Sequence, residues 1–349
     1  MASKSKVLVI GATGYIGGHI VLYWVLLWPD LQRATPPSRW CDPPPWPPRP
    51  PCSTPSKLPA SLSFSSPLIK SILQPLRTVP TRTAANSSMA MHIPLQGTLE
   101  DHESLVAAIK QVDVVISAIG SNTLDHLKII EVIKQVGTIK RFFPSEFGND
   151  VDRVHALEPA KTHVFGLKAQ IRRAVEESGI PYTFVVSNGF AGYFLSNLLQ
   201  HGLQAPPRDK VSIYGSGDVN FITVLEEDVG AYTMKAVDDP RTLNKTLHIR
   251  PPANIVSMNS LVEMWETLIG KTLEKVTVTE EDMVKQIQGV CGFLAKTPFP
   301  GKILPAIFHD IVIQGDQCNF ELGPKDVEAT TLYPDHKYTT AKEYLARLL

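Results

Sequence analysis

The chain has 349 residues, enough for one large or two ordinary domains around a sizeable core. Hydrophobic residues make up 43% and charged residues 19%, which is a globular composition. Lys+Arg and Asp+Glu both number 34, so no basic surplus indicates nucleic acid or an anionic membrane as partner. The four cysteines have neither metal-site spacing nor the density of a disulfide scaffold, so we expect a cytoplasmic protein without a metal. The apolar run Ile20–Trp28 is too short to span a bilayer, which needs about 20 residues.

The N-terminal stretch KVLVIGATGYIGG is typical of a dinucleotide-binding domain. Residues 6–10 form a short apolar run of the kind that makes a strand buried on both faces. Gly11, Gly14 and Gly17 follow at GxxGxxG spacing, and a helix is predicted to begin near Tyr15. Such a turn brings backbone N–H groups at a helix start close to a pyrophosphate. A tight turn without a ligand is the alternative interpretation.

Strand and helix patterns then alternate, which predicts βαβ units and a doubly wound sheet. The predicted strands are 112–120, 181–188 and the first part of 139–148, a segment in which a strand runs into a loop. The predicted helices are 101–111, 124–137 and 168–179. After Asn188 the pattern weakens, and helices are expected at 257–269, 280–288 and 339–349. The sequence therefore predicts an α/β fold: a Rossmann-type doubly wound parallel sheet with a smaller α+β substrate domain. We place the NAD(P)-binding domain at 1–187 and the mainly substrate-binding domain at 188–349.

A proline-rich segment interrupts this pattern between about residues 21 and 90. Eleven prolines lie between Pro36 and Pro59, and serine and threonine dominate from Ser53 to Ser88. Proline lacks the N–H that helices and central strands need, so we expect irregular structure in place of the second βαβ unit.

Several long motifs resemble the plant isoflavone reductase-like proteins, an NmrA-like, atypical branch of the short-chain dehydrogenases. They include PSEFGNDVDRVHALEPAK from Pro144, KAQIRRAVEESGIPYTFVVSNGFAGYF from Lys168 and GDQCNFEL from Gly315. The family contains phenylcoumaran benzylic ether reductases, pinoresinol–lariciresinol reductases, isoflavone reductases and eugenol synthases, and FGNDVDRVHALEPAK is most similar to the first branch. The resemblance covers residues 5–20 and 92–349.

The resemblance implies NADPH as cofactor, a small phenolic substrate and a general base at Lys168. The usual Tyr-xxx-Lys pair is absent, since Val164 stands four residues before Lys168. Beside an apolar pocket the pKa of a lysine can fall from about 10.4 toward 7–8, which suits removal of a phenolic proton. A solvated lysine at a helix start is the alternative, and the family match favours the base.

The other expected site residues lie at the carboxyl ends of the predicted strands, where open α/β sheets bind ligands. With Lys168, the expected cofactor-binding residues are Gly11, Thr13, Gly14, Tyr15, Ile16, Gly17, Ser117, Ala118, Ser145 and Phe147. Glu146 either lies beside them or caps neighbouring backbone. By resemblance to a substrate-pocket segment, the expected substrate residues are Asn188, Gly189 and Phe190, with a position in the core as the alternative for Phe190. Several relatives carry a bulkier residue at Gly189, so this glycine is expected to widen the pocket.

The chain departs from the family where relatives carry a second strand ending in Val-Arg, whose arginine holds the 2′-phosphate of NADPH. Read from the third base of each codon, the codons for Ala34–Asp42 can encode His-Pro-Thr-Val-Ala-Leu-Val-Arg. In this shifted frame the second Val is the only residue possible at its position, and the last codon encodes either Arg or a stop. One hypothesis is therefore a shift of reading frame that ends before His92; the other is a genuine insertion.

These observations leave three functions open. The favoured one is NADPH-dependent reduction of a phenylpropanoid-derived substrate, with opening of the benzylic ether of a phenylcoumaran-type lignan. Isoflavone reductase or eugenol synthase activity is the enzymatic alternative. A non-catalytic NmrA-like dinucleotide-binding protein, or an inactive product of a frame-damaged gene, is the third. Whether the chain forms a homodimer is also open.

Overall fold

The computed structural model describes residues 5–12, 14–26, 99–120, 125–289 and 302–349, with side chains described only to residue 23 in the second range. Thr13 and most of the proline-rich segment lie outside these residues, so the expectations for them stay predictions.

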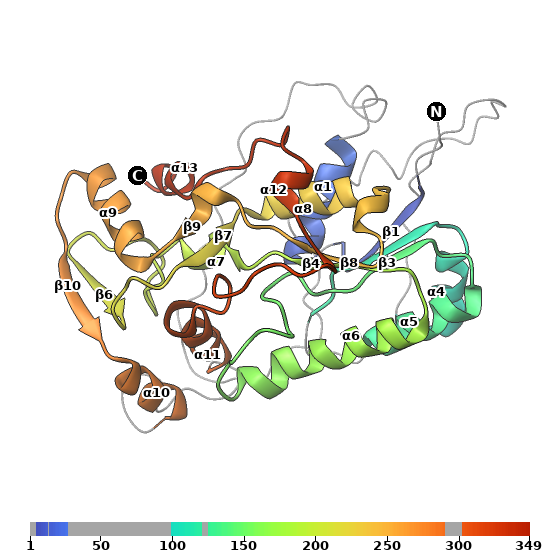
Figure 1. The fold of residues 1–349 in the computed structure, drawn as a ribbon, viewed down its shortest axis with the longest axis horizontal. Helices are drawn as coiled ribbons and strands as arrows, with labels where there is room; N and C mark the ends of the chain where they lie inside the picture. Colours follow the sequence, from blue (N-terminus) through green and yellow to red (C-terminus); the bar gives the residue numbers. More distant parts are fainter. Residues whose placement is uncertain (1–4, 13, 27–98, 121–124, 290–301) are drawn as a thin grey trace. The chain divides into compact units, whose positions relative to one another are not determined.

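Within the described residues, six parallel strands form the central sheet, in the order β1-β2-β3-β4-β8-β11; Figure 1 labels β1, β3, β4 and β8. The bridges Phe142–Tyr182 and Gly148–Val186 join its two three-stranded parts. Because all six strands are parallel, their carboxyl ends lie at one edge. The strands are β1 (Val7–Ile10), β2 (Val114–Ser117), β3 (Arg141–Phe143), β4 (Thr183–Val186), β8 (Lys245–His248) and β11 (Asp326–Glu328).

Helices cover both faces of this sheet, as a doubly wound fold requires. Alternate residues of β2 face opposite cores: Ile116 packs with α1 and α8, and Val115 packs with the other three helices. Apolar side chains on both faces explain why the strands are continuous hydrophobic runs. The helices are α1 (Tyr15–Leu26), α8 (Glu226–Ala236), α4 (His102–Ile109), α5 (Asp125–Val136) and α6 (Leu167–Ser178).

The sequence predicted irregular structure from residue 21, but helix α1 continues to Leu26. The first proline after the glycine turn is Pro29, so nothing before it forbids a helix. Packing on α8 supports the added turns: Ile20 is fully buried, and a Cβ at Gly230 would lie only 2.7 Å from the His19 carbonyl oxygen. The prediction was therefore wrong for residues 21–26.

The later part of the chain forms a separate core around Trp265, which is fully buried and donates to the Pro207 carbonyl at 2.7 Å. Its sheets are β5-β7-β9 and β6-β10. Its strands are β5 (Gly189–Phe190), β6 (Lys210–Tyr214), β7 (Phe221–Val224), β9 (Ile255–Val256) and β10 (Glu274–Val278). Its helices are α7 (Ala191–Phe194), α9 (Met258–Ile269), α10 (Glu280–Gln288), α11 (Ile303–His309) and α13 (Ala341–Ala346). Helix α12 (Ala329–Leu332) packs instead with α1 and α8 in the core of the first-half sheet.

The helices and strands expected in the first half are confirmed: the strands, α4 and α5 are shorter than predicted, α6 is shifted by one residue, and α1 is longer. Asp101 caps α4 by accepting from the Ser104 N–H at 3.1 Å, and Gly179 ends α6 with a φ of 72°. The domain division at residue 187 stays a prediction. Strands β8 and β11 and helix α8 lie after that point in the sequence and pack on the first-half sheet.

Candidate functional site

The glycine-rich turn joins β1 to α1 at the carboxyl edge of the sheet. Gly11 has a φ of 80°, and a Cβ there would lie 2.8 Å from the Ala118 carbonyl oxygen. A Cβ at Gly17 would lie 2.1 Å from the Gly11 carbonyl oxygen, so only glycine allows the helix to start this close to the strand. Gly14 is exposed at the turn, whereas Ile16 and Gly17 are buried. The turn therefore offers backbone N–H groups at a helix start, as phosphate binding requires.

Ser117 ends β2 and Ala118 follows it beside this turn, at the strand end where the sequence predicted them. The Ala118 N–H donates to the Ile10 carbonyl at 2.8 Å, which fixes the two strand ends together. The Ser117 hydroxyl is buried and lies 3.0 Å from His126 Nε2. Its side chain is engaged within the protein, so only the backbone here can take part in ligand binding.

The loop Pro144–Gly148 carries β3 to the same edge and meets the first turn of α6. Its Gly148 carbonyl accepts from the Asn188 N–H at 3.0 Å, which ties it to the end of β4. Phe147 and Asn188 have φ values of 31° and 58°, left-handed conformations that non-glycine residues rarely adopt. Strained backbone of this kind gathers at functional sites.

Lys168 points from α6 toward this loop. Its ammonium donates to the Glu146 backbone carbonyl, and a Cβ at Gly148 would lie 3.8 Å from its Nζ. The side chain keeps part of its surface exposed. Burial lowers the pKa of Lys168 to about 8; the Glu146 carboxylate opposes this shift and the Arg172 guanidinium adds to it. Lys168 is thus a lysine with a sizeable neutral fraction near neutral pH, as a general base needs.

Glu146 and Arg172 form an ion pair beneath Lys168. Arg172 Nε donates to Glu146 Oε1 at 2.8 Å, and its Nη2 donates to Oε2. The Glu146 carboxylate therefore faces Arg172 rather than a ligand. Sequence reasoning did not single out Arg172. The sequence feature that could have indicated it is its position four residues after Lys168, between the apolar Ile171 and Val175, on the buried side of an amphipathic helix.

The expected substrate segment follows β4. Asn188 donates from Nδ2 to the Ile249 carbonyl at 2.9 Å, so its side chain holds the backbone in place. A Cβ at Gly189 would lie 3.1 Å from the Ile222 oxygen and 3.1 Å from a ring carbon of Phe194. The space beside Gly189 is filled by these atoms, so the expectation that this glycine widens a pocket was wrong.

Aromatic side chains connect the substrate segment to the start of α1. The Tyr15 ring lies 5.8 Å from the Phe190 ring and 4.8 Å from that of Tyr193, between centroids. The Tyr15 hydroxyl donates to Glu226, and the same carboxylate oxygen accepts from the Gly192 N–H at 3.1 Å. Glu226 was also missed by sequence reasoning; its signal was the acidic first turn of α8 after a buried strand.

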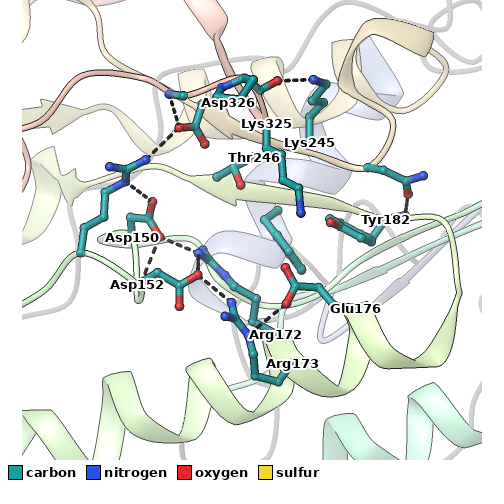
Figure 2. Close-up of a pocket in the computed structure, with 15 residues that line it drawn as sticks. Asp150, Asp152, Arg172, Arg173, Glu176, Tyr182, Lys245, Thr246, Lys325 and Asp326 are labelled. Carbon is teal, nitrogen blue, oxygen red and sulfur yellow. Dashed lines mark hydrogen bonds and ion pairs between the residues drawn. The ribbon is translucent and has the colours of Figure 1, made fainter.

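A cavity of about 500 Å³ lies between α6 and the first residues of β4, β8 and β11 (Figure 2). Each of its carboxylates has an arginine partner: Arg153 pairs with Asp150 and Asp326, and Arg173 pairs with Asp152 and Glu176. Arg172 also lines this cavity.

Within residues 5–26, 99–120, 125–289 and 302–349, apart from Thr13, no cluster of three or more His, Cys, Asp or Glu could hold a metal ion. Over the same part of the chain, every helix is too short or too polar to cross a membrane.

The fold defines a class: a Rossmann-type α/β protein in which the glycine turn, the strand ends and a lysine-bearing helix come together at the carboxyl edge of the sheet. The NmrA-like family model matches residues 80–345. The phenylcoumaran benzylic ether reductase PT1 of Pinus taeda is 49% identical over 350 residues, covering 100% of both chains. Eugenol synthase 1 of Petunia hybrida is 48% identical over 99% of both chains. The solved structure of AtPrR2 with NADP+ and (+)pinoresinol is 33% identical over 100% of both chains, with a TM-score of 0.77.

The chain belongs to the NmrA-like family, and within it to the plant isoflavone reductase-like proteins. The family model begins to match at residue 80, after the glycine turn and most of the proline-rich segment. The pairwise match to the Pinus taeda protein runs through both.

Proposed function

We propose that this protein is an NADPH-dependent reductase that opens the benzylic ether of a phenylcoumaran-type lignan. The observation that carries the proposal is Lys168, a half-buried lysine with its pKa lowered to about 8, at the ligand edge of a Rossmann-type sheet. The resemblance to phenylcoumaran benzylic ether reductases supports the choice of substrate class.

The residues present fit a dinucleotide. A Cβ at Gly11 or Gly17 would collide with backbone, so the turn keeps the close geometry that a pyrophosphate needs. The N–H groups of residues 15–17 would hold the phosphates, with the side chain of Thr13 as a further expected contact, while the Gly14 N–H closes the turn by donating to the Gly11 carbonyl at 2.8 Å. Ala118, Ser145 and Phe147 lie along the same edge and would contact the nicotinamide half, Ser117 taking part through its backbone. NADPH supplies a hydride to the benzylic carbon when bound.

The chemistry assigned to the protein itself is proton removal. The Lys168 amine would take the proton of the substrate phenol, since a neutral amine with a pKa near 8 is a competent base at neutral pH. The resulting phenolate expels the ether oxygen from the benzylic carbon, and this oxygen leaves as a second phenolate that takes up a proton from water. Asn188 and Phe190 would border the substrate, with the Tyr15 and Tyr193 rings alongside Phe190.

The test is turnover of NADPH by the purified chain with a phenylcoumaran lignan, and with an isoflavone as comparison. Lys168→Met should lower kcat by about 10²–10⁴, the usual contribution of a general base, with NADPH binding retained. Lys161→Met is the matched control, because Lys161 is exposed at the start of the π-helix (Lys161–Gly166) that precedes α6 and should tolerate the change. Unchanged turnover in Lys168→Met would refute the assigned role. NADPH binding without turnover of any such substrate would favour a non-catalytic dinucleotide-binding protein.

A further inference from the structure

Lys168 and Arg172 lie one turn apart on α6, and both side chains bind the same residue of the facing loop. The Lys168 ammonium donates to the Glu146 backbone carbonyl, while Arg172 donates to both Glu146 carboxylate oxygens. The Glu146 and Arg172 side chains are each 3% exposed. A two-pronged, charge-assisted contact of this kind fixes geometry as well as adding energy. The ion pair therefore holds in place the Glu146 backbone carbonyl, which accepts the hydrogen bond from Lys168.

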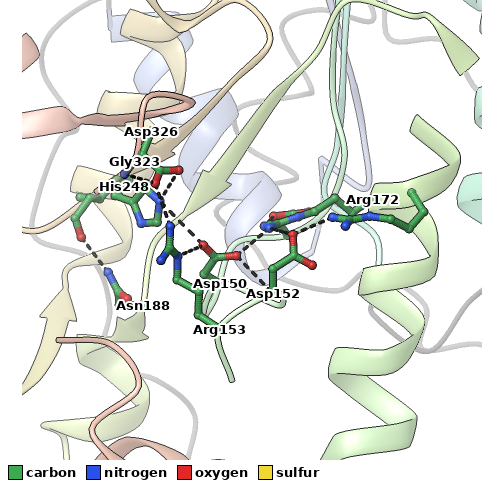
Figure 3. Close-up of polar contacts among 11 residues, drawn as sticks. Asp150, Asp152, Arg153, Arg172, Asn188, His248, Gly323 and Asp326 are labelled. Carbon is green, nitrogen blue, oxygen red and sulfur yellow. Dashed lines mark hydrogen bonds and ion pairs between the residues drawn. The ribbon is translucent and has the colours of Figure 1, made fainter. Parts of the chain in front are cut away.

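Arg172 is itself held from the other side. Its Nη1 donates to Asp150 Oδ1 at 2.6 Å and to Asp152 Oδ2 at 2.9 Å (Figure 3). Asp150 is anchored in turn by Arg153, which donates to it from Nε at 3.1 Å. The guanidinium lies over the Phe184 ring, 4.9 Å from its centroid. These contacts leave Arg172 little freedom to turn away from Glu146.

We propose that Glu146 and Arg172 are positioning residues for Lys168: their buried ion pair fixes the carbonyl that orients the lysine amine and balances the charge around it. The inference rests on the proposed role of Lys168 as base. Neither residue needs to touch the substrate, because each acts through the lysine.

The charge balance gives the two residues opposite effects. The charged groups that act on Lys168 are the Glu146 carboxylate from the loop, which raises its pKa, and Arg172 from its own helix, which lowers it. Asp150 and Asp152 stand behind Arg172 and are bonded to it, and His248 lies 3.8 Å behind Asp150. Removing the carboxylate should therefore lower the pKa of Lys168, and removing the guanidinium should raise it.

The experiment measures the proton affinity of Lys168 without using turnover. Competitive labelling with acetic anhydride over a pH series, read by peptide mass spectrometry, gives the midpoint of Lys168 reactivity. Glu146→Gln should move this midpoint to lower pH and Arg172→Gln to higher pH, each by about one pH unit, as expected for a charge close to a titrating group. The pH profile of kcat/KM should move in the same directions.

Two controls keep the result interpretable. Arg173→Gln should leave the midpoint unchanged, because Arg173 lines the same cavity but pairs with Asp152 and Glu176. Removing one partner of a buried pair is destabilising, so thermal melts accompany each variant. The neutral double variant Glu146→Gln/Arg172→Gln removes both charges, and its midpoint should lie between those of the single variants.

Shifts of the same sign in both single variants, or no shift in either, would overturn the proposal, since loosened packing alone would move both midpoints in one direction. Opposite shifts in a protein that reduces no phenolic substrate would support the arrangement around Lys168 and count against the proposed function.

Discussion

The Tyr15 hydroxyl donates to the Glu226 carboxylate, which links the first residue of α1 to the first residue of α8. Glu226 is 3% exposed, and burial raises its pKa while the Tyr15 hydrogen bond lowers it. The same oxygen holds the Gly192 N–H of the substrate segment. One carboxylate therefore connects the cofactor turn with the expected substrate side.

Tyr15→Phe should destabilise the protein by about 1–3 kcal/mol, because a buried acceptor loses a charge-assisted donor. Urea unfolding of parent and variant measures this difference. Tyr23→Phe, further along the same helix, is the control for the loss of a tyrosine hydroxyl. Equal unfolding midpoints for Tyr15→Phe and the parent would show that the contact adds nothing.

The parent enzyme should show an ascending pH limb in kcat/KM with a midpoint near 8. Lys168 has its pKa lowered to about 8 and must be neutral to accept a proton, so activity rises as pH passes through that value. Initial rates between pH 6 and 10 at low substrate measure the limb. A limb that persists unchanged in the residual activity of Lys168→Met would assign it to another group.

Gly14 and Gly17 should respond differently to added side chains. A Cβ at Gly14 would lie 3.2 Å from the Gly11 oxygen, on an exposed turn, so Gly14→Val should weaken NADPH binding more than folding. A Cβ at Gly17 would lie 2.1 Å from that oxygen, so Gly17→Ala should mainly lower the melting temperature. Fluorescence titration and thermal melts separate the two effects. Full NADPH affinity in a folded Gly14→Val protein would contradict the phosphate-binding role of the turn.

Asp310 should make stability depend on pH. It is fully buried, and burial together with Asp316 raises its pKa to about 8, while Asn149 donates to it at 2.6 Å. The unfolded chain loses this proton near pH 4, so folded-state stability falls as pH rises from there through 8. The lowered pKa of Asp316 acts with the opposite sign, at lower pH.

Asp310→Asn imitates the protonated acid, so it should be less sensitive to this rise in pH. The urea concentration at the unfolding midpoint of Asp310→Asn, minus that of the parent, should increase between pH 6 and pH 9. Parallel midpoints of the two proteins over that range would show that Asp310 does not carry the proton.

The chain as written should bind NADPH with little preference over NADH. The Val-Arg that the family resemblance expects after a second strand is missing, and no other arginine was assigned to the 2′-phosphate. Dissociation constants for NADPH and NADH measure the preference, beside a variant carrying the frame-shifted reading of the proline-rich segment, which should restore it. Tight and selective NADPH binding by the chain as written would reveal a 2′-phosphate site formed by other residues.

Local sequence pattern determined much of the first-half fold. Apolar runs such as 112–120 gave β2, and helical spacing with a capping Asp101 gave α4, because local propensity and burial on both faces agree there. The spacing of Gly11, Gly14 and Gly17 likewise predicted the turn, since backbone clearance alone demands glycine there. The family resemblance identified Lys168 as the candidate base, but it did not identify the residues that contact Lys168.

Tertiary structure decided which side chains meet. Arg172 and Glu146 lie 26 residues apart, and Tyr15 and Glu226 lie 211 apart, so no local pattern links them. Strands β8 and β11 were missed because the alternating pattern of strands and helices weakens after Asn188. They nevertheless complete the sheet, since β8 pairs with β4 and β11 pairs with β8. The direction of the Lys168 pKa shift also follows from tertiary contacts, because desolvation and neighbouring charges exist only once the loop has folded against α6.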